Sequence, residues 1–244
     1  MTKPLPTVIL GRTGLRVTRL GYGAAHRKPQ SDENAKAVHE AVLDSGINFI
    51  DTADDYGNSE ELIGRYMSAR SGEYHIATKC GGSESGHVWT RENLLRGVAE
   101  SLQKMRRESI DLLQLHNPDV ETCERAGLVD VLQEIQAGGA ARFIGCSATS
   151  PDLKTYIDWG VFDVFQIPYS AMDRQHENLI SEAANAGAGV IVRGGVARGE
   201  PGAGRGTPDR WATFEKANLD ELREGGALGL SVGGEAQPLD PALF

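Results

Sequence analysis

The amino-acid sequence predicts an α/β protein in which short buried strands alternate with longer helices. Six mostly apolar runs of strand length recur along the chain, separated by segments whose apolar residues have helical spacing. Because the runs are apolar on both faces, they are typical of a parallel sheet that is covered on both sides. The six runs are Ile47–Ile50, His75–Thr78, Asp111–Leu115, Arg142–Cys146, Asp163–Gln166 and Gly189–Val192.

Two closures of such a sheet fit the pattern: an open doubly wound sheet and a (β/α)8 TIM barrel. The length of 244 residues fits the barrel, for which about 250 residues are typical. The first strand, expected near Thr18–Gly21, is not followed by a Gly-x-Gly-x-x-Gly motif, which disfavours a dinucleotide-binding open sheet. We therefore predict a barrel that forms a single domain over residues 1–244.

The chain before the first strand predicts a β-hairpin. Val8–Leu10 and Leu15–Val17 flank the turn sequence Gly-Arg-Thr-Gly, and a hairpin over residues 1–17 can plug one end of a barrel. Helix boundaries are also legible. Thr90 is a predicted N-cap, and Gly138 stands where a left-handed C-cap is wanted.

The C-terminal quarter departs from the repeating pattern. Residues 194–209 form a predicted glycine-rich loop, and a seventh helix is expected after Thr207 and Pro208. Beyond it, Leu228–Val232 is the candidate for an eighth strand, and residues 225–244 predict an irregular tail. The last strand and helix of the barrel are therefore minimal or missing.

Composition excludes several classes of function. The 25 basic and 34 acidic residues give a net charge of −9, which disfavours nucleic acid and anionic membranes as partners. No apolar run has the length of a signal peptide or a membrane span, and the three cysteines are widely spaced. We therefore expect a cytoplasmic protein. We also expect no metal site, because four of the six histidines lack the spacing of metal ligands: His26, His75, His87 and His176.

A polar or ionisable residue stands at the end of each predicted strand from the second to the seventh. In a barrel these ends meet on one face, and that face holds the active site. The residues are Asp51 with Tyr56 in the following loop, Lys79, His116, Ser147, Gln166 with Tyr169, and Arg193.

Four of these side chains suit one reaction. A buried Lys79 beside Asp51 stays protonated, because the opposite charge offsets desolvation. The phenol of Tyr56 can give its proton to a carbonyl oxygen, because the ammonium of Lys79 stabilises the phenolate that remains. A neutral His116 can donate a hydrogen bond to the same oxygen.

Proton donation to a carbonyl oxygen suits the reduction of the carbonyl group, which also needs a source of hydride. No side chain supplies hydride, so a nicotinamide cofactor is implied. Ser147 and Gln166 suit the carboxamide edge of its ring, and Tyr169 offers a face for stacking.

The sequence resembles the aldo-keto reductase superfamily from about Leu10 to Gly199. The resemblance implies NADPH-dependent reduction of a small aldehyde or ketone, with Asp51, Tyr56, Lys79 and His116 as the catalytic tetrad. The segments that carry it are LGRTGLRVTRLGYGA, GINFIDTADDYGNSEELIG, IATKCG, LLQLHNPD, FIGCS, FQIPYS and GVIVRGGVARG.

The same resemblance assigns the cofactor contacts. Ser147, Gln166 and Tyr169 match the family's nicotinamide contacts, and the loop from Arg193 to Gly199 matches the one that crosses the pyrophosphate. The predicted cofactor-binding residues of that loop are Arg193, Gly194, Gly195, Val196 and Gly199. Two departures weaken the expected NADP(H) binding: Ala148 follows Ser147, and no Lys or Arg occurs after Arg223.

Two alternatives stay open. The shortened C-terminus favours a catalytically weak barrel that serves as a nucleotide-sensing or regulatory module, a role that potassium-channel β subunits of this superfamily illustrate. A Schiff-base lyase using Lys79 is disfavoured, because Asp51 keeps the amine charged. An incomplete barrel also leaves apolar faces to cover, which favours a homo-oligomer.

Overall fold

The structure is a computed structural model, and it describes residues 4–25, 31–83, 86–170 and 173–194 of the chain. The chain divides into two compact units. One consists of Met1–Ile167 and Asn178–Ile191, and the other of Pro168–Glu177 and Val192–Phe244. The single domain expected from the sequence stays a prediction.

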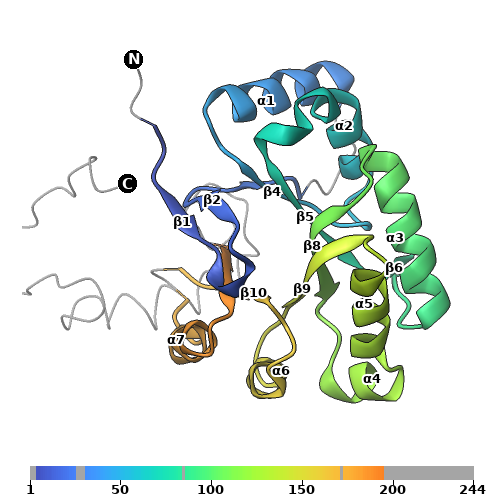
Figure 1. Ribbon diagram of the computed structural model, residues 1–244, viewed down its shortest axis with the longest axis vertical. Coiled ribbons are helices and arrows are strands. Elements are labelled where there is room, and N and C mark those ends of the chain that lie inside the picture. Colours follow the sequence, from blue (N-terminus) through green and yellow to red (C-terminus); the bar gives the residue numbers. More distant parts are fainter. Residues whose placement is uncertain (1–3, 26–30, 84–85, 171–172, 195–244) are drawn as a thin grey trace, which may run out of the picture. The chain divides into compact units, whose positions relative to one another are not determined.

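Seven strands form one sheet in the order β11-β10-β9-β8-β5-β4-β3, and each pair from β3 to β10 is parallel (Figure 1). Order in the sheet follows order in the chain, which confirms the predicted α/β barrel class. The predicted eighth strand, Leu228–Val232, lies outside the described residues. The strands are β3 (Tyr22–Gly23), β4 (Phe49–Asp51), β5 (His75–Cys80), β8 (Ile110–His116), β9 (Ala141–Ser147), β10 (Val164–Pro168) and β11 (Gly189–Arg193).

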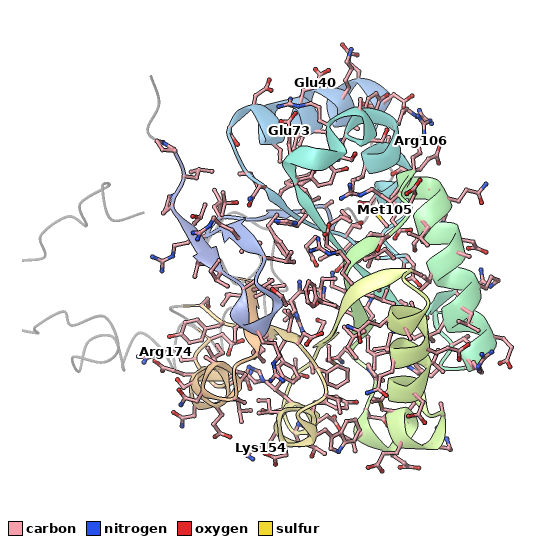
Figure 2. All side chains as sticks on the ribbon, viewed as in Figure 1. Glu40, Glu73, Met105, Arg106, Lys154 and Arg174 are labelled. Carbon is pink, nitrogen blue, oxygen red and sulfur yellow. The ribbon has the colours of Figure 1, made fainter. Side chains whose placement is uncertain are left out.

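The helices pack beside one another along the sheet, and charged side chains such as Glu40, Glu73 and Lys154 extend from this layer (Figure 2). None of the described helices is long and apolar enough to cross a lipid bilayer. The helices are α1 (Asp32–Asp44), α2 (Ser59–Tyr66), α3 (Arg91–Met105), α4 (Val120–Arg125), α5 (Leu128–Ala137), α6 (Asp152–Trp159) and α7 (Glu177–Asn185), with 3-10 turns η1 (Gly11–Thr13) and η2 (Ser68–Glu73).

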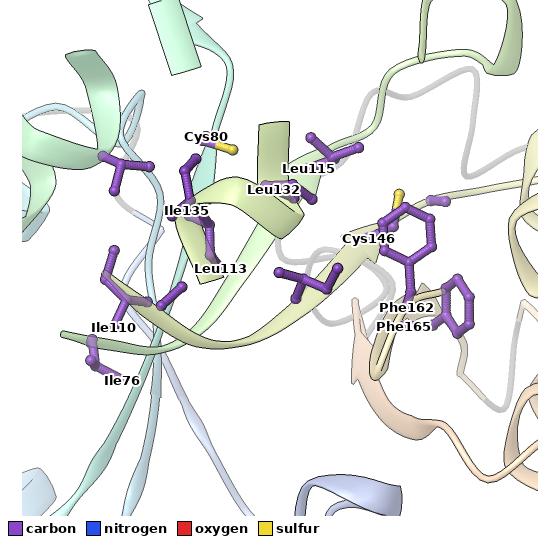
Figure 3. Close-up of a cluster of buried hydrophobic side chains, with 14 of the residues drawn as sticks. Ile76, Cys80, Ile110, Leu113, Leu115, Leu132, Ile135, Cys146, Phe162 and Phe165 are labelled. Atoms are coloured by element: carbon purple, nitrogen blue, oxygen red, sulfur yellow. The ribbon is translucent and has the colours of Figure 1, made fainter. Parts of the chain in front are cut away.

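The main core lies between the sheet and this helical layer. Branched side chains from the strands meet those of α5, and two phenylalanines extend the cluster toward β10 (Figure 3). Burial of this apolar surface, at about 25 cal/mol per Å², is the main force that holds the layers together. Members of the cluster include Ile76, Ile110, Leu113, Leu115, Leu132, Ile135, Phe162 and Phe165.

A hairpin of β1 (Thr7–Ile9) and β2 (Arg16–Thr18) precedes the sheet. Its buried residues Leu10, Leu15 and Val17 form a second apolar cluster with residues near the amino ends and middles of the sheet strands. The hairpin therefore covers the interior of the sheet away from the carboxyl ends of its strands. The residues that it contacts in this cluster are Phe49, Ala77, Leu112 and Val164.

The first sheet strand begins later than the predicted Thr18–Gly21. Thr18 ends the hairpin, where it pairs with Thr7, and its N–H donates to Asn48 Oδ1 at 2.6 Å. Because these bonds hold Thr18 in the hairpin, the chain enters the sheet only at Tyr22.

The helix caps follow local side-chain chemistry. The Thr90 hydroxyl accepts from the Asn93 N–H at 3.2 Å, which confirms the predicted N-cap of α3. The predicted left-handed residue after α5 is wrong by one position. Gly138 keeps a helical φ of −73°, and Gly139 has the positive φ of 82°.

A buried carboxylate fastens the amino end of β8. Asp111 accepts from the Ile76 N–H at 2.9 Å and from Arg142 Nη1 at 2.6 Å. Arg107 Nη2 and His75 Nδ1 lie 3.4 and 3.6 Å from its oxygens. Burial raises the pKa of the Asp111 carboxyl, but hydrogen bonds from His75, Ile76 and Arg142 outweigh it and hold the pKa below its ordinary value.

Candidate active site

The carboxyl ends of adjacent strands bring the predicted side chains to one edge of the sheet. Asp51 is the last residue of β4, Lys79 lies near the end of β5, and His116 is the last residue of β8. Neighbouring registers align these ends, since Lys79 stands opposite Gln114 and His116 opposite Ser147. Parallel pairing therefore places residues from distant parts of the chain side by side.

An ion pair forms the base of the site. Lys79 Nζ donates to Asp51 Oδ2 and to the carbonyl oxygen of Thr52, both at 2.8 Å. The Lys79 side chain is only 1% exposed, so its ammonium depends on these partners. Removing one member of a buried pair costs about 3–5 kcal/mol, because the other charge is left without a partner.

The phenol of Tyr56 lies over this ion pair. The loop after β4 turns back through a bond from the Tyr56 N–H to the Ala53 carbonyl at 3.2 Å, and this places the ring 4.9 Å from Lys79 Nζ. The His116 ring meets the Tyr56 ring edge to face, with centroids 5.6 Å apart. The structure thus brings together Asp51, Tyr56, Lys79 and His116 at half-buried to buried positions.

A glutamine that the sequence analysis did not single out supports the carboxylate. Gln114 is fully buried in β8 and its Nε2 donates to Asp51 Oδ1 at 3.2 Å. The sequence does contain a cue for this role, because Gln114 precedes His116 by two residues and therefore faces the same side of the strand. A polar residue on an inward face of an apolar strand needs a partner.

The loop after β4 is held by a second, half-buried carboxylate, that of Asp54. Asp54 Oδ2 accepts from the Gly82 N–H at 2.9 Å, and burial raises the pKa of Asp54. Gly82 belongs to the small hairpin of β6 (Gly82–Ser83) and β7 (Gly86–His87). A Cβ at Gly82 would lie 2.5 Å from Asp54 Oδ1, so only glycine lets this hairpin approach the loop.

The next residue of the loop joins two histidines. Asp55 Oδ1 lies 3.2 Å from His116 Nδ1, and Asp55 Oδ2 lies 3.4 Å from His87 Nε2. Burial raises the pKa of the Asp55 carboxyl. The hydrogen bond from His116 and the charges of both histidines together lower it by more, so the pKa lies below its ordinary value. His87 was expected to have no ligand role because it lacks metal-ligand spacing, and no spacing rule links it to His116, which lies 29 positions away.

The predicted cofactor contacts divide into three groups. Ser147 is the last residue of β9, and Gln166, in the middle of the neighbouring strand β10, stands opposite it in register. The two residues are 1% and 2% exposed. Among the described residues, neither side chain has a hydrogen-bond partner, so both can serve an amide-bearing ligand. Tyr169, Arg193 and Gly194 belong to the second unit, where the Tyr169 N–H donates to the Arg193 carbonyl at 3.2 Å. The other three, Gly195, Val196 and Gly199, lie outside the described residues.

The structure has the parallel sheet that the resemblance implies, and these side chains lie near the carboxyl ends of its strands. A comparison with known protein families identifies the same family. Residues 19–216 match the family described as the Aldo/keto reductase family, and the chain belongs to that family.

Particular relatives can then be named. The chain is 29% identical over 207 residues to the L-galactose dehydrogenase of Arabidopsis thaliana, which covers 78% of this chain and 65% of the relative. It is 32% identical over 200 residues to the NADH-specific methylglyoxal reductase of Escherichia coli, which covers 72% of this chain and 60% of the relative. The chain spans less than two thirds of the length of these curated relatives.

A solved structure is similar throughout the described fold. The chain matches the holo form of an aldo-keto reductase from Bacillus halodurans with a TM-score of 0.75 and 28% identity. The match covers 84% of this chain and 71% of that one.

Proposed function

We propose that this protein reduces an aldehyde or ketone to an alcohol with NADPH as the hydride donor and Tyr56 as the proton donor. The observation that carries the proposal is the Lys79 ammonium, paired with Asp51 at 2.8 Å and lying 4.9 Å from the Tyr56 ring. A positive charge held beside a phenol stabilises the phenolate that forms when the proton leaves.

Each side chain of the tetrad has one role in this proposal. Asp51 keeps Lys79 charged, and Lys79 stabilises Tyr56 as its proton passes to the carbonyl oxygen. His116 orients that oxygen by a hydrogen bond. The pairing at 2.8 Å also argues against a Schiff-base mechanism, since a protonated Lys79 is not a nucleophile.

Residues of this chain also fit the cofactor. Ser147 and Gln166 offer a hydroxyl and an amide, both without partners among the described residues, at neighbouring strand ends beside His116. These groups are suited to the carboxamide of a nicotinamide ring, which supplies the hydride when it is bound. We assign these two side chains to hold the ring in place. Tyr169 and Arg193, which belong to the second unit, stay predicted cofactor contacts from the sequence.

The test follows the oxidation of NADPH by the absorbance of its reduced nicotinamide ring, with a panel of small aldehydes and ketones as substrates. We expect turnover by the wild-type chain and a loss of about 10²–10⁴-fold in kcat/KM for Tyr56→Phe. Tyr66→Phe is the matched control, because Tyr66 lies at the end of α2 and outside the site.

Turnover that is no faster in the wild type than in Tyr56→Phe would overturn the proposal. If NADPH then still binds tightly in a calorimetric titration, the result favours a nucleotide-sensing or regulatory module instead of a reductase.

A further inference from the structure

Three side chains at the mouth of the site converge on one point, and two of them, Asp55 and His87, have no role in the proposed reaction. Asp55 comes from the loop after β4, His87 from β7, and His116 from the end of β8. One ligand atom from each lies within 4.8 Å of the other two. The individual separations are 3.2 Å for Asp55 to His116, 3.4 Å for Asp55 to His87 and 3.4 Å for His87 to His116.

These separations match the edges of a coordination polyhedron. Zn²⁺ binds imidazole nitrogen and carboxylate oxygen at about 2.0–2.1 Å, so two ligands of a tetrahedral site stand about 3.3 Å apart. The separation between His87 Nε2 and His116 Nδ1 lies at this value, and each of these nitrogens is 3.2–3.4 Å from one of the two carboxylate oxygens of Asp55. All of these separations are longer than the ~2.7–2.9 Å of a strong charge-assisted hydrogen bond.

Packing holds the ligands in place before any ion arrives. The His87 ring lies 5.3 Å from the Trp89 ring, and Trp89 in turn packs over Gly81. His116 rests edge-on against Tyr56 at 5.6 Å. A site whose ligands are already positioned by neighbouring side chains loses little entropy on binding.

Charge and access also suit a cation. Asp55 and His87 are exposed and His116 is partly exposed, so an ion can reach all three. The positive charge of Lys79 is already paired with Asp51. Asp54 adds a second carboxyl group near Asp55.

We propose that Asp55, His87 and His116 form a binding site for one divalent transition-metal ion, with Zn²⁺ as its expected occupant. Two imidazoles and one carboxylate are a ligand set that suits Zn²⁺, and a fourth position is left for water. Because His116 is one of the ligands, the ion holds this side chain away from its role toward a carbonyl oxygen. Zn²⁺ is therefore an inhibitor of the reductase, a consequence that rests on the proposed function.

The binding itself is tested without any turnover. Zn²⁺ is titrated by calorimetry into the metal-free full-length chain, and Co²⁺ is followed by its visible absorbance. We expect one equivalent of Zn²⁺ per chain and a loss of affinity of at least about tenfold in His87→Gln. The matched control is His75→Gln, which removes a partly exposed imidazole beside another carboxylate, Asp111, and is expected to leave the affinity unchanged.

The inhibition is tested separately. Zn²⁺ is expected to slow NADPH oxidation by the wild type, EDTA to restore it, and His87→Gln to keep its activity at the same Zn²⁺ concentration. Tyr56→Phe is expected to bind Zn²⁺ normally although it does not turn over, so failure of the reductase proposal leaves the metal measurement intact.

Three results would overturn the inference. They are no saturable binding of Zn²⁺ or Co²⁺, equal affinity in wild type and His87→Gln, and equal inhibition of these two proteins by Zn²⁺.

Discussion

A lysine that is 1% exposed shows how burial and pairing act on a single residue. Lys79 is paired inside the protein, because its Nζ donates to Asp51 Oδ2 and to the Thr52 carbonyl, both at 2.8 Å. The cysteines show the opposite case, since burial without a cationic partner raises the pKa of Cys123 to about 11 and also raises the pKa of Cys80 and Cys146. These thiols therefore stay protonated, and they fill space as small apolar groups.

Asp111 allows a test of how a paired carboxylate contributes to stability. Its pKa in the folded state lies below its ordinary value, so its stabilising effect is present above the unfolded pKa and is lost as the pH falls through the folded pKa. We expect Asp111→Asn to lower the free energy of unfolding by about 1.5–3 kcal/mol at neutral pH. The difference from wild type narrows below about pH 4, near the unfolded pKa of aspartate.

Urea unfolding of both proteins at neutral and acidic pH measures this effect. Asp44→Asn is the control, because Asp44 pairs with Arg70 on the surface and is 68% exposed. Its loss is expected to cost less than about 1 kcal/mol. A difference between wild type and Asp111→Asn that is the same at both pH values contradicts the assignment.

The sequence predicted the residues of the site that stand at strand ends, and it missed those that reach the site by tertiary contact. Asp51, Lys79 and His116 each follow a recognisable apolar run, so strand polarity alone places them at one edge. The contact between His87 and His116 depends on how the β6–β7 hairpin lies over the loop after β4. No local pattern encodes that packing.

Among the elements, α2 and α3 approach each other so closely that one position admits only glycine. A Cβ at Gly64 would lie 1.9 Å from the carbonyl oxygen of Lys104 and 2.9 Å from the carbonyl carbon of Met105. Figure 2 shows Met105 at the end of α3, where the two helices meet. Since both contacts are with backbone atoms, an added methyl group has to push the helices apart.

Two glycine substitutions compare this contact with an open helical position. Gly64→Ala is expected to lower the free energy of unfolding by at least about 1–3 kcal/mol through overpacking. Gly97→Ala, inside α3, meets its nearest atom, Asp54 Oδ2, at 3.4 Å and is expected to gain about 0.5–1 kcal/mol from helix propensity. Chemical denaturation of both variants measures the difference, and equal effects would contradict the close approach.

Most element positions were predictable because each strand is a short apolar run bounded by polar or glycine residues. The exceptions have tertiary causes. Thr18 looks like the start of a sheet strand, yet its bonds to Thr7 and Asn48 hold it in the hairpin. Gly138 looks like a helix terminator, yet the helical turn continues through it and Gly139 takes the left-handed conformation. Local sequence alone does not show whether Thr18 belongs to the hairpin or to the sheet, or which of the two glycines after α5 takes the left-handed conformation.

Across the whole molecule, the two ends of the sheet strands differ in character. Near the amino ends, the hairpin cluster and the Asp111 network join strands and helices. At the carboxyl ends, ionisable groups of the proposed site gather at half-buried positions. Changes at one end are therefore expected to alter stability, and changes at the other to alter chemistry.

Binding of the proposed cofactor is expected to raise the thermal stability of the chain. A ligand present at 100 times its dissociation constant stabilises the folded state by about 2.7 kcal/mol. For a chain of this size, each kcal/mol corresponds to about 2–4 °C in Tm. We expect NADPH to produce a shift of this order in wild type and in Tyr56→Phe, and a smaller shift in Gln166→Leu.

Differential scanning fluorimetry with increasing NADPH measures these shifts. A Tm that does not respond to NADPH in any of the three proteins contradicts the assignment of Ser147 and Gln166 to the cofactor.

The β1–β2 hairpin also has a kinetic consequence. Within the part of the chain that the structure describes, Leu10, Leu15 and Val17 fill the space beside the amino ends and middles of the sheet strands. A ligand is therefore expected to reach Tyr56, and to leave it, from the side of the carboxyl ends of the strands. If the cofactor and the carbonyl compound both use this route, they are expected to bind in a fixed order. The ligand that lies deeper binds first and dissociates last.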